Sequence, residues 1–340
     1  MRASKIFVAT AMTAAIFALG ACSNSDEPEV VDLTKPIKLD MSLGSLTRAT
    51  YDPERATFDD EDKIGLYVGT CQNNEQAGMP ATDAPNSVRN VVFTKSSSAS
   101  GGSASDWSGV IYWQSTTLYH TIYAYSPYNA DLETNNRKIS FTLNADQSAG
   151  TNYKDADYLW CKGTQTKADD NSHQVELEHK MSRIKIVLKA DGSKDLTYAD
   201  LKAMTLKILG TVKSKGTFDV AAGSISADAS NKDITDGLKP LRVENDGNST
   251  LSYYAIVLPG TEYANSAGFV SLVQADAGGG ETTYLYSLGG TGGFTTQSGY
   301  EYVFTLTASK KGIDLGQFTI KAWNKSKDES GDAGMVVPVS

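Results

Sequence analysis

The histidines are the first residues to consider for chemistry, because the chain contains only 3 of them. Two of them are the first and last residues of the segment His173-Gln-Val-Glu-Leu-Glu-His179. On a β-strand, whose side chains alternate between two faces, both histidines share one face, and Glu176 and Glu178 lie on the other. The rise of a strand separates the two rings by roughly 20 Å, which is too far for one metal ion. The segment therefore indicates an ordinary strand, and we expect no metal, no cofactor and no enzymatic centre.

Three further patterns are weaker candidates for chemistry. Gly289–Gly293 is glycine-rich like a phosphate loop, but no helix start with a Lys-Ser/Thr pair follows it, so it indicates a turn. The acidic run Asp59–Asp62 lacks the ligand spacing of a calcium loop and is typical of a solvated turn. Cys71 and Cys161 either pair in an oxidising compartment or remain reduced, and sequence leaves both alternatives open.

Cys22 carries the clearest chemical signal in the chain. A basic start with Arg2 and Lys5 precedes the apolar stretch Ile6–Leu19, which is too short to span a bilayer. The stretch ends in Leu19-Gly20-Ala21-Cys22, and small residues before a cysteine resemble the lipobox of bacterial lipoproteins. This resemblance implies a signal peptide over residues 1–21 and a Cys22 that carries diacylglycerol and palmitate, anchoring the chain to a membrane. The alternative is an ordinary secretory signal with a chance cysteine.

Residues 22–48 are expected to form a lipidated tether followed by a cleavable first strand. The apolar positions of this strand are Ile37, Leu39, Met41 and Leu43. They alternate with polar residues, and this period of two predicts a strand with one buried face. A short Gly/Ser/Thr loop then leads to Arg48 and Ala49, which form a trypsin-like cleavage site, with Arg55 and Ala56 in reserve. The alternative is an ordinary first strand with an incidental surface arginine.

The charge of the chain excludes one class of partner. Asp and Glu number 40 against 31 Lys and Arg, which gives a formal net charge of −9. A nucleic-acid backbone repels such a chain, so we expect no nucleic-acid partner.

The remaining sequence predicts an all-β protein. Short alternating apolar runs recur about every ten residues between turn-forming clusters, which is typical of β-sandwiches. Only Tyr198–Met204 favours a brief helix. The polar segment Ala190–Asp195 is the expected boundary, so we predict two tandem Greek-key, transthyretin-like β-sandwich domains over residues 49–192 and 193–340.

Several segments, taken in order, resemble the fimbrillin-like family, the type V pilins and related fimbrial lipoproteins of gut and oral anaerobes. They are Leu19–Cys22, Arg48–Thr50, Phe58–Val68, His179–Leu188, Tyr253–Gly260 and Tyr300–Trp323. The resemblance covers nearly the whole chain beyond the signal peptide. It implies a subunit of a cell-surface fimbria, structural or adhesive, that reaches the outer membrane as a lipoprotein and enters the fimbrium after processing.

The resemblance also implies an assembly mechanism, donor-strand exchange. An arginine-specific protease cuts after the arginine, the first strand leaves, and a strand of another subunit fills the exposed groove. The candidate donor here lies in the tail, where the side chains of Met335, Val337 and Val339 alternate in direction with those of Val336 and Pro338. The tail is short, and a last strand or a frayed end is an equally good interpretation of it. A second interpretation is a non-polymerising surface lipoprotein that binds glycans or host ligands. The least supported interpretation is a surface hydrolase with an unrecognised carboxylate pair.

Overall fold

The structure, a computed structural model, describes twelve stretches of the chain. They are residues 32–43, 58–72, 78–80, 88–96, 107–193, 195–210, 212–228, 233–264, 268–276, 278–288, 293–323 and 335–337. Nearly all regular structure in these stretches is β-strand, so the prediction of an all-β protein is confirmed. Residues 31–340 form one unit by their internal contacts, and residues 1–30 lie outside the described residues.

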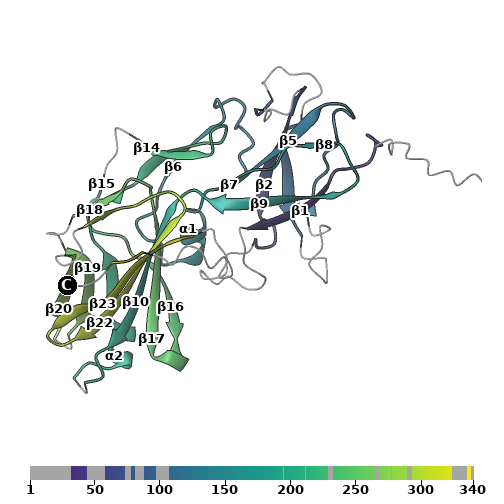
Figure 1. Ribbon diagram of the computed structural model, residues 1–340. Helices are drawn as coiled ribbons and strands as arrows, with labels where there is room; N and C mark the ends of the chain where they lie inside the picture. Colours follow the sequence, from purple (N-terminus) through teal and green to yellow (C-terminus); the bar gives the residue numbers. More distant parts are fainter. Residues whose placement is uncertain are drawn as a thin grey trace, which may run out of the picture. The chain divides into compact units, whose positions relative to one another are not determined.

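The first sheet has eight strands, which come from residues 38–179. Figure 1 shows several of them, among them β1, β2, β5 and β9. Its strands are β1 (Lys38–Leu43), β2 (Lys63–Cys71), β3 (Val88–Lys95), β4 (Trp107–Ser108), β5 (Tyr119–Ser126), β7 (Leu159–Lys162), β8 (Thr166–Lys167) and β9 (Ser172–His179). The path of pairing runs β1-β9-β7-β5-β2-β3-β4, and β8 pairs with β5. Strand β1 is therefore an edge strand.

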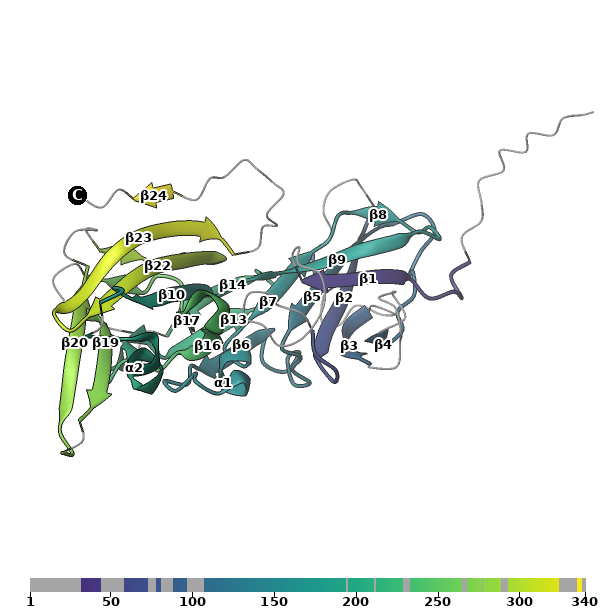
Figure 2. The ribbon, with the colours of Figure 1, turned by 90° about the horizontal axis from the view of Figure 1, so that it is seen from below.

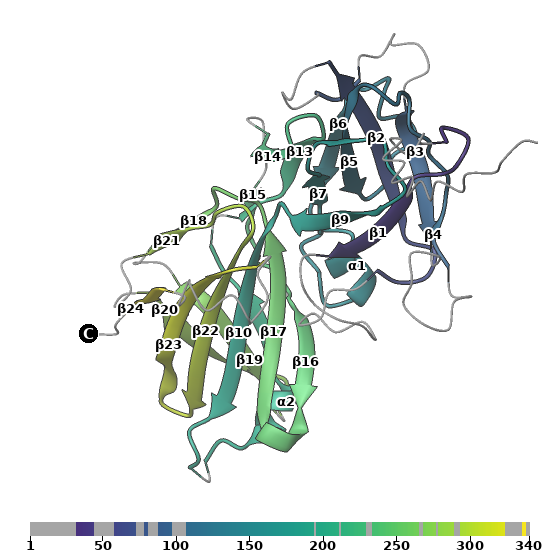
Figure 3. The ribbon, with the colours of Figure 1, turned by 45° about the vertical axis from the view of Figure 1, so that its right-hand side comes forward.

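The second sheet has six strands, and all but one come from beyond residue 240. In order across the sheet they are β16 (Leu241–Asn245), β17 (Thr250–Val257), β10 (Ser182–Ala190), β22 (Tyr300–Ser309), β23 (Gly312–Ala322) and β24 (Met335–Val337). Figure 3 shows β16, β17, β10, β22 and β23 side by side. Strand β10 lies at the centre of the sheet, between β17 and β22.

The remaining strands form four small sheets. These are β11 (Thr205–Ile208) with β19 (Gly268–Ala275) and β20 (Glu281–Ser287); β6 (Lys138–Thr142) with β13 (Lys215–Asp219) and β14 (Ser224–Ala227); β12 (Val212–Lys213) with β15 (Asp233–Ile234); and β18 (Glu262–Tyr263) with β21 (Phe294–Thr295). Both β6 and β10 pair with strands beyond residue 192. Sheet pairing therefore joins residues on the two sides of residue 192. The domain limits 49–192 and 193–340 stay a prediction.

The helices are short. Helix α2 (Tyr198–Ala203) confirms the predicted helix and begins at a capping box, in which the Asp200 carboxylate accepts the Thr197 backbone N–H at 2.8 Å. Helix α1 (Gly150–Lys154) has only five residues, and its sequence carries no helical period that would predict it. A 3-10 turn, η2, covers Asp246–Asn248.

The buried side chains form three clusters, because several strands are apolar on both faces. On β2, Leu66 points into a cluster that we call the N-terminal core, and the next residue, Tyr67, points into a second cluster, the central core. The central core also receives residues of the second sheet, such as Tyr254 and Ile256 of β17. The other face of the second sheet, with Ile184 and Phe304, lies in the third, C-terminal core.

Candidate functional site

Strand β1 pairs with β9 in a parallel ladder. Lys38 lies opposite Ser172, and the register continues to Leu43 opposite Leu177. Figure 2 shows β1 running alongside β9. Strand β7 pairs with β9 only at Glu178 and His179, so along Ser172–Leu177 the partner of β9 among the described strands is β1. Removal of β1 would leave six residues of β9 with unpaired backbone groups.

The inward face of β1 belongs to the N-terminal core. Ile37, Leu39 and Leu43 are only 7%, 5% and 8% exposed, and they lie in one cluster with residues such as Ile64, Val175 and Leu177. Met41 packs against this cluster as well but is only partly buried, so it lies on the predicted inward face with less of its surface covered. We call the surface of β9 and the N-terminal core that β1 covers the β1 site.

Polar contacts hold the start of β1. The Ile37 backbone N–H donates to the Ile111 carbonyl at 2.9 Å, and Pro36 bridges to Tyr112. The Lys38 ammonium donates to the Asp170 carbonyl at 2.7 Å. These contacts tie β1 to two segments besides β9, so release of the strand requires more than loss of one ladder.

His173 has a structural role beside the β1 site. Its Nε2 lies 2.8 Å from the Asp169 carboxylate, and the indole N–H of Trp113 donates to the Asp169 carbonyl at 2.9 Å. Burial raises the pKa of Asp169, but hydrogen bonds from Asn171 and His173 outweigh it and lower that pKa. The ring of Trp113 packs edge-on against His173 and His120, with centroids 5.1 Å and 4.9 Å away.

His120 is fully buried, and burial lowers its pKa to about 4. A ring with such a pKa stays neutral at ordinary pH. It therefore packs beside Trp113 as an uncharged aromatic.

His179, at the other end of β9, meets the second sheet. Its ring stacks on Trp323 at 3.9 Å, and its Nδ1 lies 2.9 Å from the Asp157 carboxylate. The guanidinium of Arg183 lies 4.7 Å from the same Trp323 ring and donates to Glu301 at 2.7 Å. Burial raises the pKa of Glu301, but the charges of Arg183 and Lys321 together outweigh it and lower that pKa. Sequence reasoning missed this buried ion pair, because its partners lie far apart in the chain.

The predicted strand over His173–His179 is confirmed as β9, with Val175 and Leu177 buried on the face of the histidines and both glutamates exposed. Among the described residues, no group of three or more His, Cys, Asp or Glu side chains could hold a metal ion.

The other chemical candidates have structural explanations or lie outside the described residues. Asp59 and Asp62 both contact the Lys154 ammonium at 2.7 Å, so part of the acidic run forms an ion pair with α1.

Cys71 lies opposite Tyr119 and Cys161 opposite Ala124, on the two flanks of β5. Five residues of strand separate these positions by about 17 Å, far beyond disulfide reach, and the two cysteines are not bonded.

Cys22, Arg48, Ala49, Arg55 and Ala56 all lie outside the described residues, as do Gly289 to Gly292.

The tail residues Met335–Val337 form β24, which pairs antiparallel with β23 through three residues at the edge of the second sheet. Figure 2 shows β24 beside β23. In this structure the backbone of these residues therefore forms a last strand, which was one of the alternatives for the tail. Val339 lies outside the described residues.

The fold is thus that of an all-β protein whose first strand closes the edge of a sheet. Residues 47–323 match the model of the fimbrillin-like family, and the chain belongs to this family. Membership in this family indicates a fimbrial protein.

Solved structures agree with this fold. A proposed cell adhesion protein from Bacteroides uniformis is similar with a TM-score of 0.54 and 22% identity, over 85% of this chain and 99% of the other. A proposed cell adhesion protein from Bacteroides ovatus is similar with a TM-score of 0.54 and 18% identity, over 85% and 98% of the two chains. No curated protein matches the chain. No helix within the described stretches is long and apolar enough to cross a membrane.

Proposed function

We propose that the protein is a structural or adhesive subunit of a type V pilus that is assembled by donor-strand exchange at the β1 site. The observation that carries this proposal is the position of β1. It is an edge strand that, with Ile37 just before it, buries three aliphatic side chains, and it covers a stretch of β9 with no other strand partner among those described. Such a strand can be replaced by another of similar pattern without breaking the rest of the sheet.

The energy of the β1 site explains why assembly needs a cut. Burial of Ile37, Leu39 and Leu43 contributes roughly 1.5–3 kcal/mol for each side chain, or about 5–9 kcal/mol together before ordering costs. Each 1.4 kcal/mol is about a factor of ten in an equilibrium, so the uncut strand rarely leaves. Cleavage makes β1 a separate peptide, which loses the high effective concentration of an attached segment and can diffuse away.

The proposed cut lies after Arg48, so that the mature chain begins at Ala49. Arg55 and Ala56 form the reserve site. The partner for this step is an arginine-specific protease at the cell surface. Acylation at Cys22 holds the precursor in the outer membrane until the cut, which releases the body of the protein from its lipid anchor for the fimbrium.

The donor strand is proposed to be the tail of another subunit, with Met335, Val337 and Val339 directed into the β1 site. The backbone of Met335–Val337 pairs with β23 through only three residues, against six for β1 with β9. This shorter ladder has fewer hydrogen bonds to lose, so the tail can leave its own subunit more readily than β1 does.

The experiment is treatment of the purified protein with an arginine-specific protease, followed by electrophoresis without boiling in mild SDS. We expect a ladder of oligomers, because strand-exchanged subunits bury a continuous strand. The matched control is the double variant Arg48→Ala/Arg55→Ala, which should stay monomeric under the same treatment. Correct cleavage without a ladder would contradict the assembly mechanism and favour the alternative, a non-polymerising surface lipoprotein that binds glycans or host ligands.

A further inference from the structure

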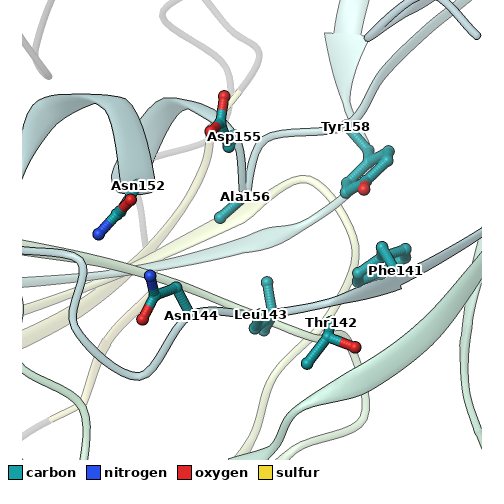
Figure 4. A pocket seen from close by; sticks show the side chains of 8 residues that line it. All are labelled: Phe141, Thr142, Leu143, Asn144, Asn152, Asp155, Ala156 and Tyr158. Atoms are coloured by element: carbon teal, nitrogen blue, oxygen red, sulfur yellow. The ribbon is translucent and has the colours of Figure 1, made fainter.

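A pocket lies between the end of β6 and helix α1, away from the β1 site (Figure 4). It has a volume of about 220 Å³ and is lined by residues that include Phe141, Leu143, Asn144, Asn152, Asp155 and Tyr158. All of its lining residues come from positions 141–158, and the buried ones among them belong to the central core. The pocket is therefore built locally, by one strand end, one loop and one short helix.

One end of the pocket is aromatic. The rings of Phe141 and Tyr158 stack with centroids 4.4 Å apart and an angle of 28° between their planes. Leu143 is buried and lies between this aromatic end and the two asparagines in Figure 4. This part of the pocket favours an apolar ligand surface of the size of one ring.

The other end is polar, and its amides are held in fixed orientations. Asn144 Oδ1 accepts the backbone N–H of Asp146 at 3.0 Å, which leaves the Asn144 NH₂ group to donate. Asn152 Nδ2 donates to the Asp146 carbonyl at 2.8 Å, which leaves its Oδ1 to accept. The two side chains face each other at this end in Figure 4. The pocket thus offers a donor and an acceptor side by side.

Asp155 adds a second acceptor. Its side chain is exposed and makes no hydrogen bond or ion pair with any residue in the described part of the chain. Burial raises the pKa of Tyr158 to about 12, and the nearby charge of Asp155 adds to this rise. None of the lining residues is basic, so an anionic ligand would meet only the negative charge of Asp155.

The loop that carries the polar end is fastened to the second sheet. Gln147 is fully buried, and its amide makes two hydrogen bonds of 2.8 Å with the backbone of Ile256. Asp146 accepts the backbone N–H of Ser148 at 3.0 Å, which closes a second turn in the same loop. The binding groups are therefore preorganised, which lowers the entropic cost of binding.

We propose that this pocket binds a single sugar residue of a glycan, with Phe141 and Tyr158 against its C–H face and Asn144, Asn152 and Asp155 on its hydroxyls. A sugar ring combines one apolar face with hydroxyls that both donate and accept, and this matches the two ends of the pocket. The inference does not depend on strand exchange, because the pocket shares no residue with β1 or β9.

The test is saturation-transfer difference NMR on the purified, uncut protein with the methyl glycosides of glucose, galactose, mannose, fucose and N-acetylglucosamine. We expect at least one to bind with a Kd of about 1 mM, as a ligand of this size allows. Asp155→Ala removes one acceptor, and Asn144→Asp keeps the bond to Asp146 but replaces the donor. Each should weaken binding about tenfold or more. The matched control is Asp131→Ala, an exposed aspartate outside the pocket whose side chain has no partner among the described residues.

Three outcomes would overturn the proposal. The first is no saturation transfer from the wild-type protein to any glycoside. The second is an equal signal in the wild type, both pocket variants and the control. The third is stronger binding of butylammonium that is lost in Asp155→Ala, which would assign the pocket to an amine. All readouts use uncut monomer, so failure of strand exchange does not affect them.

Discussion

The substitution Leu39→Ala tests whether side-chain burial holds β1 in place. Leu39 is 5% exposed and packs in the N-terminal core. Removal of a buried leucine side chain costs 2–5 kcal/mol in protein cores, and we expect about 2–3 kcal/mol here because an edge strand can relax toward the cavity. The same loss would make release of the cut strand roughly 30–150 times faster, at 1.36 kcal/mol for each factor of ten.

Two neighbours on the same strand provide graded controls. Met41 is only partly buried, so Met41→Ala should cost about 1 kcal/mol. Ser42 makes no side-chain hydrogen bond with the described residues, and Ser42→Ala should stay within about 0.5 kcal/mol of the wild type. The structure therefore predicts that the loss of stability on substitution by alanine falls in the order Leu39 > Met41 > Ser42, rather than being uniform along the strand.

Two assays read this order. Urea unfolding of the uncut protein measures the change in the free energy of unfolding. After the cut, exchange of β1 for a labelled peptide with the sequence Ile37–Leu43, followed by fluorescence anisotropy, measures release. If Leu39→Ala and Met41→Ala cost the same, or if Leu39→Ala leaves the exchange rate unchanged, burial in the N-terminal core is not what holds β1.

Four further predictions address processing, assembly and pH. Cys22→Ala should abolish acylation, because the lipobox hypothesis makes this thiol the acceptor of the lipid. Metabolic labelling with a fatty-acid analogue checks this, and equal label in the variant and the wild type would exclude the lipoprotein hypothesis. Arg48→Ala should remove the mature form that begins at Ala49, as N-terminal sequencing of the surface-exposed protein would report; persistence of that form would refute the site. Deletion of Met335–Ser340 should leave a folded monomer that cannot extend a polymer; normal fibres by electron microscopy would move the donor role elsewhere. His120→Leu should make the free energy of unfolding less sensitive to acid. The pKa of His120 is lowered from 6.5 to about 4 in the folded state, so the unfolded chain binds the proton first as the pH falls. The wild type should therefore lose about 2–3 kcal/mol of stability relative to the variant between pH 7 and pH 4. Parallel pH profiles of urea unfolding would contradict this assignment.

Local patterns in the sequence predicted local structure. The alternation in Ile37–Leu43 and in His173–His179 predicted two strands and their inward faces, because the side chains of a strand alternate with a period of two whatever its partner. The cleavage and lipidation signals at Arg48 and Cys22 are also local, since proteases and acylating enzymes act on short segments. The prediction of these processing sites therefore rests on sequence alone.

Only the tertiary structure decided which segments meet. The parallel pairing of β1 with β9, more than 130 residues further along the chain, depends on the register of whole strands, and no spacing in either segment specifies it. The partial exposure of Met41, the ion pairs of Lys154 with Asp59 and Asp62, and the ladder of β24 on β23 follow from packing of distant elements. The pocket beside α1 could not be predicted for a different reason. Its residues are close in sequence, but the orientations of their amides depend on how the loop turns and how Gln147 anchors it to Ile256, and contacts of this kind leave no periodic pattern in the chain.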